Sequence, residues 1–402
     1  MSHEKLSALP GGTAVAAVDT PALFAWLKDR HDSIVNDLTT LVNLETPSTD
    51  KALLDEALEW LETWSDAMLG KPDSRHRSPG GRYGDILISE YAGESEKLIT
   101  FVCHYDTVWE KGTLADWPLA IDGDHATGPG IYDMKAGLIQ SVWALRALKE
   151  ASLARPRIRL LFTGDEEIGS PAARPVIEDA CRDADAVIVF EPSEQGRIKT
   201  ARKGVGRFTL RLSGVEAHAG ADYTKGVSAV DELARAVLGL HALTDLDAGT
   251  TVNVGVVSGG TRSNVVAGSA EADIDVRVTS ASEMARVDAA LADLKPANGR
   301  ARLTIDGEWN RPPMERGPLT VQMYELAAVA GRSIGIELGE ISVGGGSDGN
   351  FAAALGVPVL DGMGAVGGGP HARHEHISLS GMAERAAIAA AVVASFAGTT
   401  SG

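Results

Sequence analysis

Three short segments of the chain are almost wholly apolar, and they limit the fold more than any other feature of the sequence. They are residues 98–102 (LITFV), 159–162 (RLLF) and 186–190 (AVIVF). Strands of this kind are buried on both faces, which is typical of a parallel sheet covered by helices. Helical patterns over 135–150 and 175–184 separate them. The alternation of strand and helix predicts an α/β fold.

The middle of the chain has a different pattern. Apolar and polar residues alternate over 207–214 (RFTLRLSG), 251–257 (TVNVGVV) and 271–279 (EADIDVRVT). Such alternation indicates antiparallel strands with one face in water. Two helical segments, at about 226–242 and 281–293, lie between or after these strands. The order β-α-β-β-α-β predicts a ferredoxin-like α+β sandwich.

The α/β pattern returns after Arg311, so the second pattern is an insertion within the first. We expect one α/β domain formed by residues 1–203 and 313–402, with a mixed, mainly parallel sheet. Residues 204–312 form the smaller inserted α+β domain. A chain of 402 residues is long enough for two such domains.

Composition limits the classes of partner and the compartment. The chain has 37 basic and 55 acidic residues, a net charge of -18, which disfavours nucleic acid and anionic membranes. Cys103 and Cys181 have no paired spacing, so we expect no disulfide and a reducing, cytoplasmic location. No apolar run is long enough to span a bilayer, and the N-terminus lacks the pattern of a signal peptide. The first ten residues and the tail AGTTSG are expected to be loosely ordered.

Acidic residues and histidines lie at the ends of the predicted strands or in loops. His104, Asp106, Glu166, Glu167 and Glu191 follow the apolar strands, Asp133 lies in a glycine-rich loop that opens a helix, and His371, His374 and His376 share a late loop. Taken singly, each has an ordinary explanation, such as a surface hydrogen bond or a solvated helix start. The carboxyl ends of strands in an open α/β sheet form a crevice, so these residues can converge. Imidazole and carboxylate without thiolate suit zinc, and less selectively cobalt or manganese.

A series of motifs then runs along nearly the whole chain. It comprises HYDTV, GPGIYDMKAG, GDEEIGS, FEPS, GVEAHAG, RSNVV and GGGSDGNFAA. Each motif alone is weak, but their order is specific. The chain resembles the di-zinc metallopeptidases that include glutamate carboxypeptidase, acetylornithine deacetylase and succinyl-diaminopimelate desuccinylase. The glutamate carboxypeptidase branch is the nearest likeness.

The resemblance implies two zinc ions per subunit, with Asp133 as the bridging ligand and a cis peptide bond between Asp133 and Met134. The residues that match metal ligands are His104, Asp133, Glu167, Glu191 and His371. Similar proteins carry a histidine followed by a glutamate after three or four intervening residues. His371 and Glu375 satisfy this spacing, so His371 is expected, and His374 is the alternative.

Three further residues are expected to act in catalysis. Glu166 matches the general base of similar proteins. Asp106 is placed by its spacing to accept the other imidazole N–H of His104 and to fix its tautomer. By itself His218 reads as an exposed histidine at a strand end. The resemblance instead implies that it reaches the oxyanion from the inserted lid, often that of a partner subunit, in a homodimer whose domains close on substrate.

Arg311, Asn264 and Gly345 are the expected substrate-binding residues. An arginine can hold a carboxylate with two hydrogen bonds, and an asparagine can add another. In the branch that this chain resembles, such residues hold the free α-carboxylate of the scissile amino acid, with backbone amides around Gly345. The glycine run lacks the Lys-Ser/Thr ending of a phosphate loop, so nucleotide binding is not expected.

These residues together predict hydrolysis of an amide or peptide bond that releases a C-terminal amino acid, with glutamate or aspartate first. The substrate is a small N-acyl amino acid or a short peptide. An acetylornithine-type deacylase or a dipeptidase is the alternative within enzymes. A non-catalytic metal-dependent binding protein is the alternative outside them, and Glu166 argues against it because binding needs no general base.

Overall fold

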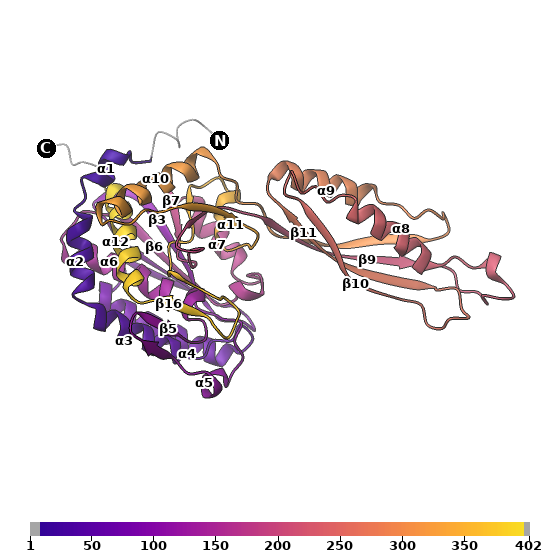
Figure 1. Ribbon diagram of the computed structural model, residues 1–402, viewed down its shortest axis with the longest axis horizontal. Coiled ribbons are helices and arrows are strands. Elements are labelled where there is room, and N and C mark those ends of the chain that lie inside the picture. Colours follow the sequence, from indigo (N-terminus) through magenta and orange to yellow (C-terminus); the bar gives the residue numbers. More distant parts are fainter. Residues whose placement is uncertain (1–8, 398–402) are drawn as a thin grey trace. The chain divides into compact units, whose positions relative to one another are not determined.

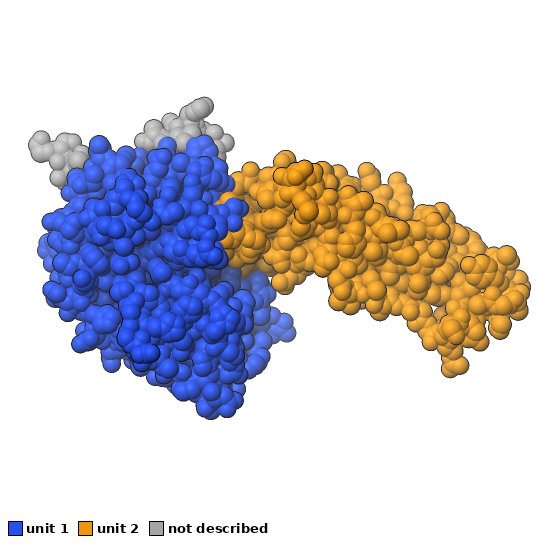
Figure 2. Space-filling view, viewed as in Figure 1, with its two compact units in different colours: residues 1–200, 316–342, 347–402 blue, residues 201–315, 343–346 orange. Residues whose placement is uncertain are grey.

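The computed structural model describes residues 9–397, which form two compact units. Unit 1 comprises residues 9–200, 316–342 and 347–397, and unit 2 comprises residues 201–315 and 343–346 (Figure 2). The expectation of loosely ordered ends falls largely outside the described residues. In the part of the chain that is described, no helix has the length and apolarity needed to cross a membrane.

A six-stranded sheet forms the centre of unit 1, in the order β1-β2-β6-β3-β7-β14. Its strands are β1 (Ser74–Ser78), β2 (Ile86–Tyr91), β3 (Ser95–His104), β6 (Pro156–Thr163), β7 (Ala186–Val189) and β14 (Val359–Leu360). β3, β6, β7 and β14 run parallel to one another, and β1 and β2 are antiparallel to their neighbours. The prediction of a mixed, mainly parallel sheet is confirmed.

Helices cover this sheet (Figure 1). They are α1 (Gly12–Ala16), α2 (Thr20–Lys28), α3 (His31–Val42), α4 (Lys51–Leu69), α5 (Thr113–Asp116), α6 (Ala136–Glu150), α7 (Arg174–Arg182), α10 (Pro318–Ser333), α11 (Gly349–Ala354) and α12 (Ser380–Ser395). α12 packs against α2, α6 and α10, whereas α7 packs against α11. α6 and α12 are buried along most of their length, because their many alanine and aliphatic residues let neighbouring helices approach closely.

A small antiparallel sheet brings a late loop beside an early one. Its strands are β4 (Ala120–Asp122), β5 (His125–Thr127), β15 (Gly367–Gly368) and β16 (His376–Ser378), in the order β15-β16-β5-β4. His371 lies in the loop between β15 and β16. Two single-turn helices, η2 (Ile131–Lys135) and η3 (Glu166–Ile168), carry the polar residues that precede α6 and follow β6.

Unit 2 is a four-stranded antiparallel sheet with two helices. Its elements are β9 (Gly204–Ser213), η4 (Tyr223–Lys225), α8 (Ala229–His241), β10 (Thr251–Gly259), β11 (Ser269–Val278), α9 (Ala281–Asp293) and β12 (Arg302–Arg311). The sheet order is β10-β11-β9-β12, and α8 and α9 pack on the face that buries Leu210 and Leu212. The chain passes between the units four times: within β8 (Ile198–Arg202), between residues 315 and 316, within β13 (Glu340–Val343), and between residues 346 and 347. The expected ferredoxin-like α+β fold is confirmed.

Candidate metal centre

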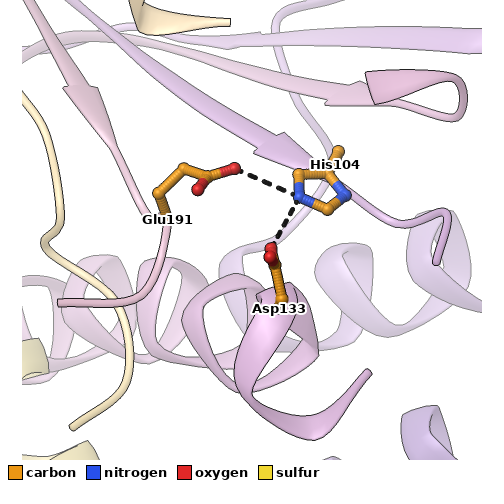
Figure 3. A group of neighbouring side chains, drawn as sticks. All are labelled: His104, Asp133 and Glu191. Carbon is orange, nitrogen blue, oxygen red and sulfur yellow. Dashed lines mark hydrogen bonds and ion pairs between the residues drawn. The ribbon is translucent and has the colours of Figure 1, made fainter. Parts of the chain in front are cut away.

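Three side chains of unit 1 point toward one another (Figure 3). His104 is the last residue of β3, Glu191 follows β7 by two residues, and Asp133 lies in η2. His104 Nε2 is 3.2 Å from Asp133 Oδ1 and 3.2 Å from Glu191 Oε1. Because β3 and β7 are parallel neighbours, their carboxyl ends bring His104 and Glu191 to one edge of the sheet.

A second group of donor atoms forms on the other oxygen of Asp133. His371 Nε2 lies 3.5 Å from Asp133 Oδ2 and 3.1 Å from Glu167 Oε2. Asp133 therefore contributes one carboxylate oxygen to each of two groups of possible metal ligands. His374, the alternative to His371, belongs to neither group.

The donor set fits two metal ions. Ligand atoms at about 2.0–2.2 Å from a tetrahedral zinc ion lie about 3.3–3.6 Å from one another. The histidine nitrogens here lie 3.1 to 3.5 Å from the carboxylate oxygens of their groups, and all donor atoms of a group lie within 4.8 Å of one another. In addition, Glu167 Oε1 is buried and has no hydrogen-bond partner among the described residues. A buried carboxylate oxygen without a partner is costly, and a metal ion would satisfy it.

The pKa values of Glu167 and His371, in the second donor group, indicate that this group requires positive charge. Burial, together with the charge of the neighbouring Asp133 carboxylate, raises the pKa of Glu167 to about 7. Hydrogen bonds to Asp133 and Glu167 raise the pKa of His371 to about 11. The protein therefore retains protons at these residues, as expected where a cation normally compensates clustered carboxylates.

The loop that carries Asp133 is fixed by Glu375, whose side chain is fully buried. Glu375 Oε1 accepts the backbone N–H groups of Tyr132 (2.8 Å) and Asp133 (3.0 Å). Glu375 Oε2 accepts the backbone N–H of Gly130 (3.1 Å) and the indole N–H of Trp109 (2.9 Å). The peptide bond between Asp133 and Met134 is cis, as the resemblance implies. The sequence analysis used Glu375 only for its spacing from His371, and it did not predict that the Glu375 carboxylate holds the loop of Asp133.

Asp106 joins two parts of the centre. His104 Nδ1 lies 3.1 Å from the main-chain oxygen of Asp106 and 3.4 Å from its carboxylate. The Asp106 carboxylate also accepts the backbone N–H groups of Glu166 (3.1 Å) and Glu167 (3.2 Å), and the hydroxyl of Ser48 (2.7 Å). Asp106 therefore orients both His104 and the η3 turn, although the main-chain oxygen is the closer acceptor for the imidazole.

Glu166 and Glu167 are adjacent in η3 but have different surroundings. Glu167 belongs to the second donor group, and its side chain is 6 % exposed. Glu166 belongs to neither donor group, and its backbone N–H is held by the Asp106 carboxylate. Of these two adjacent carboxylates, only that of Glu167 thus belongs to a group of possible metal ligands.

A buried lysine lies beside the first donor group and was missed in the sequence. Lys199 is 7 % exposed, and its Nζ lies 4.0 Å from Glu191 Oε2. The sequence does contain one indication of this residue: Lys199 lies between an isoleucine and a threonine in the strand segment RIKTAR. A lysine in a buried strand is rare enough to indicate a special environment.

The remaining predicted residues belong to unit 2 and lie at two places in it. His218 and Val265 form an antiparallel bridge, and the backbone N–H of Ala219 donates to the oxygen of Asn264, so His218 and Asn264 lie close together. Arg311 is 3 % exposed and packs against the glycine loop, where a Cβ on Gly346 would lie 2.9 Å from Arg311 Cγ.

The two places, one with His218 and Asn264 and the other with Arg311, lie at opposite ends of β9. Arg311 pairs with Val205 at the start of β9, whereas His218 follows the end of that strand at Ser213. Eight residue steps along a strand span about 27 Å. The structure therefore does not bring His218 to Arg311 within one copy of unit 2.

Comparison with known proteins gives concordant matches. A model of the family described as peptidase family M20/M25/M40 matches residues 100–395. Carboxypeptidase G2 of a Pseudomonas species is 30% identical over 397 residues, which cover 96% of this chain and 95% of that protein. The aminopeptidase PepT of Bacillus cereus has a TM-score of 0.77 at 24% identity, covering 92% of this chain and 99% of that one. The YXEP protein of Bacillus subtilis, described as a dinuclear metal-binding peptidase, has a TM-score of 0.68 at 17% identity, with 91% and 98% covered.

Proposed function

Because this chain belongs to the peptidase family M20/M25/M40 and is a hydrolase of that family, we propose that it releases a C-terminal amino acid from an N-acyl or peptidyl substrate. Glutamate is the first choice for that amino acid, and aspartate the second. The observation that carries the proposal is the pair of donor groups that share Asp133, with Glu166 directly before Glu167 in η3. The relative from Pseudomonas, which covers nearly the whole chain, bears the name of a carboxypeptidase.

The proposed cofactor is a pair of zinc ions, with cobalt or manganese as substitutes. His104, Asp133 and Glu191 would hold one ion, and Asp133, Glu167 and His371 the other. When bound, such ions polarise the scissile carbonyl and lower the pKa of water. Imidazole and carboxylate donors without thiolate support this choice of metals.

Glu166 is the proposed general base. Its carboxylate takes a proton from the water that attacks the carbonyl carbon, and it later delivers that proton to the nitrogen as the carbon–nitrogen bond breaks. Asp106 holds the backbone N–H groups of Glu166 and Glu167, so it acts as a positioning residue for both carboxylates. Proton transfer of this kind contributes about 10²–10⁴-fold to the rate.

Arg311, Asn264 and Gly345 are proposed to bind the free α-carboxylate of the substrate. The packing of Arg311 against the glycine loop restricts its side chain and supports this role for Arg311 and Gly345. A guanidinium that is already oriented loses less conformational entropy when it forms two hydrogen bonds to a carboxylate. Asn264 lies with His218 at the other end of β9, so its contact and that of His218 are proposed to come from a second copy of the chain.

A homodimer is therefore part of the proposal, with residues 204–312 as its lid and dimerisation domain. His218 of one subunit is proposed to stabilise the oxyanion at the other. Apolar side chains on α8 and on the edge strand β10 support such an interface: Leu238 is 75% exposed, and Val256 and Val257 are each 60% exposed. Exposed apolar residues on an unpaired sheet edge favour association with a second chain.

The proposed location is the cytoplasm, because Cys103 and Cys181 are both free and buried rather than paired. A deacylase of the acetylornithine type or a dipeptidase remains the second candidate, since the same donor groups serve those reactions.

A panel of N-acyl amino acids and dipeptides tests the proposal. The zinc-loaded enzyme should release glutamate faster than neutral amino acids, as measured by release of free amine, and chelation should abolish the activity. Retained turnover after complete chelation would refute the metal mechanism. Preference for neutral residues or for acetylornithine would replace the substrate assignment while leaving the mechanism intact.

A further inference from the structure

A cavity of about 340 Å³ lies in unit 1, away from the metal centre. It is formed where the C-terminal ends of α4 and α6 meet the strands β2 and β6. α6 begins directly after η2, which carries Asp133, and Lys149 near the other end of α6 lies about 20 Å further along the helix axis. The apolar part of the lining consists of Leu69, Tyr91, Leu145, Leu148, Leu153 and Ile158.

The size and lining of this cavity suit a small organic molecule. A cavity of about 150 Å³ with aliphatic and aromatic walls is large enough to bind benzene. Ligand pockets in proteins have volumes from about 300 Å³ upward. Leu148 and Ile158 are fully buried, so the cavity extends to the hydrophobic core. It therefore has room for a ring or a branched chain together with a polar group.

Arg155 adds a charged group to this lining. Its side chain is partly buried, and Nη1 donates to the main-chain oxygen of Pro156 at 3.2 Å. No carboxylate of the described residues forms an ion pair with the guanidinium. Burial lowers the pKa of Arg155, although the charges of Glu94 and Asp73 raise it. An arginine nevertheless stays protonated and has five N–H donors, so donors remain for an acceptor in the cavity.

The other charged residues of the lining are already engaged. Lys149 Nζ donates to the main-chain oxygen of Leu69 at 2.9 Å, and Arg146 donates to that of Met68 at 2.6 Å. These two cations compensate the carbonyl end of α4. Glu94 is the one carboxylate of the lining, and its Oε2 accepts a backbone N–H at 2.9 Å. The lining thus has more positive than negative charge, which favours an anion over a cation.

The backbone that carries Arg155 is fixed by the turn between β2 and β3. The backbone N–H of Glu94 donates to the oxygen of Arg155 at 2.8 Å, and Glu94 Oε2 accepts the backbone N–H of Arg155. A Cβ on Gly93 would lie 2.2 Å from the main-chain carbon of Pro156, so this close approach requires glycine. A guanidinium on a fixed backbone loses less freedom when it binds a ligand.

We propose that this cavity is a binding site for a carboxylate with an apolar body, of the class of aryl and branched-chain carboxylic acids. The carboxylate accepts hydrogen bonds from Arg155, and such charge-assisted pairs are strong and directional. The apolar body displaces water from Leu145, Leu148 and Leu153. The inference does not depend on the proposed function, although hydrolysis of an N-acyl amino acid releases acids of this class.

3-Phenylpropionate and 3-phenylpropanamide provide the test, because they have nearly the same shape and differ in charge. Calorimetric titration of the wild-type holoenzyme should give a Kd for the acid below about 1 mM, and the amide should bind at least about 10-fold more weakly. Arg155→Gln should lower the affinity for the acid about 10- to 100-fold and leave that for the amide nearly unchanged. Leu153→Phe adds volume at a partly buried position of the lining and should weaken both ligands.

Two control variants locate the bound ligand. Arg157→Gln removes a nearby arginine of β6 that lies 3.6 Å from Glu90, and it should leave both affinities unchanged. Glu167→Gln alters the second donor group and should also leave them unchanged, because the cavity is separate from the metal centre. Circular dichroism of each variant checks that it is folded.

The possible results are distinct. Absence of binding to the wild type, equal affinities for acid and amide, or an unchanged affinity for the acid in Arg155→Gln would each overturn the proposal. A loss of affinity in Glu167→Gln but not in Arg155→Gln would place the ligand at the metal centre and would overturn it too. These measurements do not require turnover, so they leave the proposed hydrolysis to its own test.

Discussion

The carboxylate of Glu375 accepts the backbone N–H of Asp133 at 3.0 Å. Glu375 lies four residues after His371, and Asp133 supplies an oxygen to each donor group. This contact, with those to Tyr132 and Gly130, links the loop that carries the last proposed ligand to the loop that carries the shared one.

Replacing Glu375 by glutamine should weaken metal binding. The amide keeps the shape but has only one acceptor oxygen, so it cannot receive the four N–H groups that the carboxylate binds. Loss of such an outer contact typically costs about 10- to 100-fold in metal affinity. Calorimetric titration with zinc measures the change. Trp109→Phe removes one donor only and should have a smaller effect, and equal affinities in wild type and Glu375→Gln would contradict the prediction.

Variants of the two adjacent glutamates, Glu166 and Glu167, should lose activity for different reasons. Glu166→Gln should retain two metal ions but lose about 10²–10⁴-fold in kcat, because no group takes the proton from water. Glu167→Gln should bind less metal, because its carboxylate belongs to a donor group. Metal analysis and single-turnover hydrolysis distinguish the two variants. Near-normal turnover by Glu166→Gln would rule it out as the base.

His371 and His374 form a matched pair for the identity of the last ligand. His371→Ala should lower the content from two ions to one, because the group formed by His104, Asp133 and Glu191 is left complete. His374→Ala should keep two ions. Metal-to-protein ratios after dialysis measure both, and the reverse pattern would assign His374 as the ligand.

Stability of the metal-free protein should fall as the pH rises. Burial raises the pKa of Glu167 from 4.5 to about 7 and that of Asp165 from 3.8 to about 7. The folded state therefore binds more protons than the unfolded state between about pH 4 and pH 7, and each group lowers the stability by up to about 1.4 kcal/mol per pH unit there.

Bound metal should weaken this dependence, because ligation keeps Glu167 deprotonated. Metal affinity should in turn rise with pH through and above pH 7, because both Glu167 and His371 must lose a proton to bind the ion. Thermal unfolding with and without zinc across this range measures both effects. Stability of the metal-free protein that increases with pH would contradict the assignment.

Mixing two inactive variants should restore activity if His218 acts across a dimer. His218→Ala and Glu166→Gln are each expected to be nearly inactive alone. Random exchange makes about half of the dimers mixed, each with one complete site, so about a quarter of wild-type activity should return. If His218 acts within its own subunit, the mixture remains inactive.

Much of the fold of unit 1 could be predicted, because the patterns that indicate its strands and helices are formed by residues close together in the sequence. The apolar runs before His104 and Glu191 identify buried parallel strands, and parallel strands bring their carboxyl ends to one edge. The residue types at those ends then restrict the chemistry to imidazole and carboxylate ligands. Fold class and candidate ligands follow from these patterns together with the motifs.

Other contacts depend on which distant residues meet, and no local pattern encodes them. Glu375 contacts Asp133 across 242 positions of the chain, and its carboxylate has no spacing rule of its own. The position of Lys199 beside Glu191 depends on β8, where the backbone N–H of Lys199 donates to the oxygen of the distant Asp361. The distance between His218 and Arg311 depends on the length of β9, which became clear only when the sheet register was known.

The split of unit 1 into segments before and after unit 2 sets an order of assembly during translation. His104, Asp133, Glu167 and Glu191 emerge from the ribosome before residues 201–315 are made, whereas His371, Glu375 and α12 emerge last. The nascent chain can thus gather the donors for one ion long before it has those for the second. Glu375, whose carboxylate holds the Asp133 loop, is among the last residues made, so this loop gains its hydrogen bonds to Glu375 only when synthesis is nearly finished.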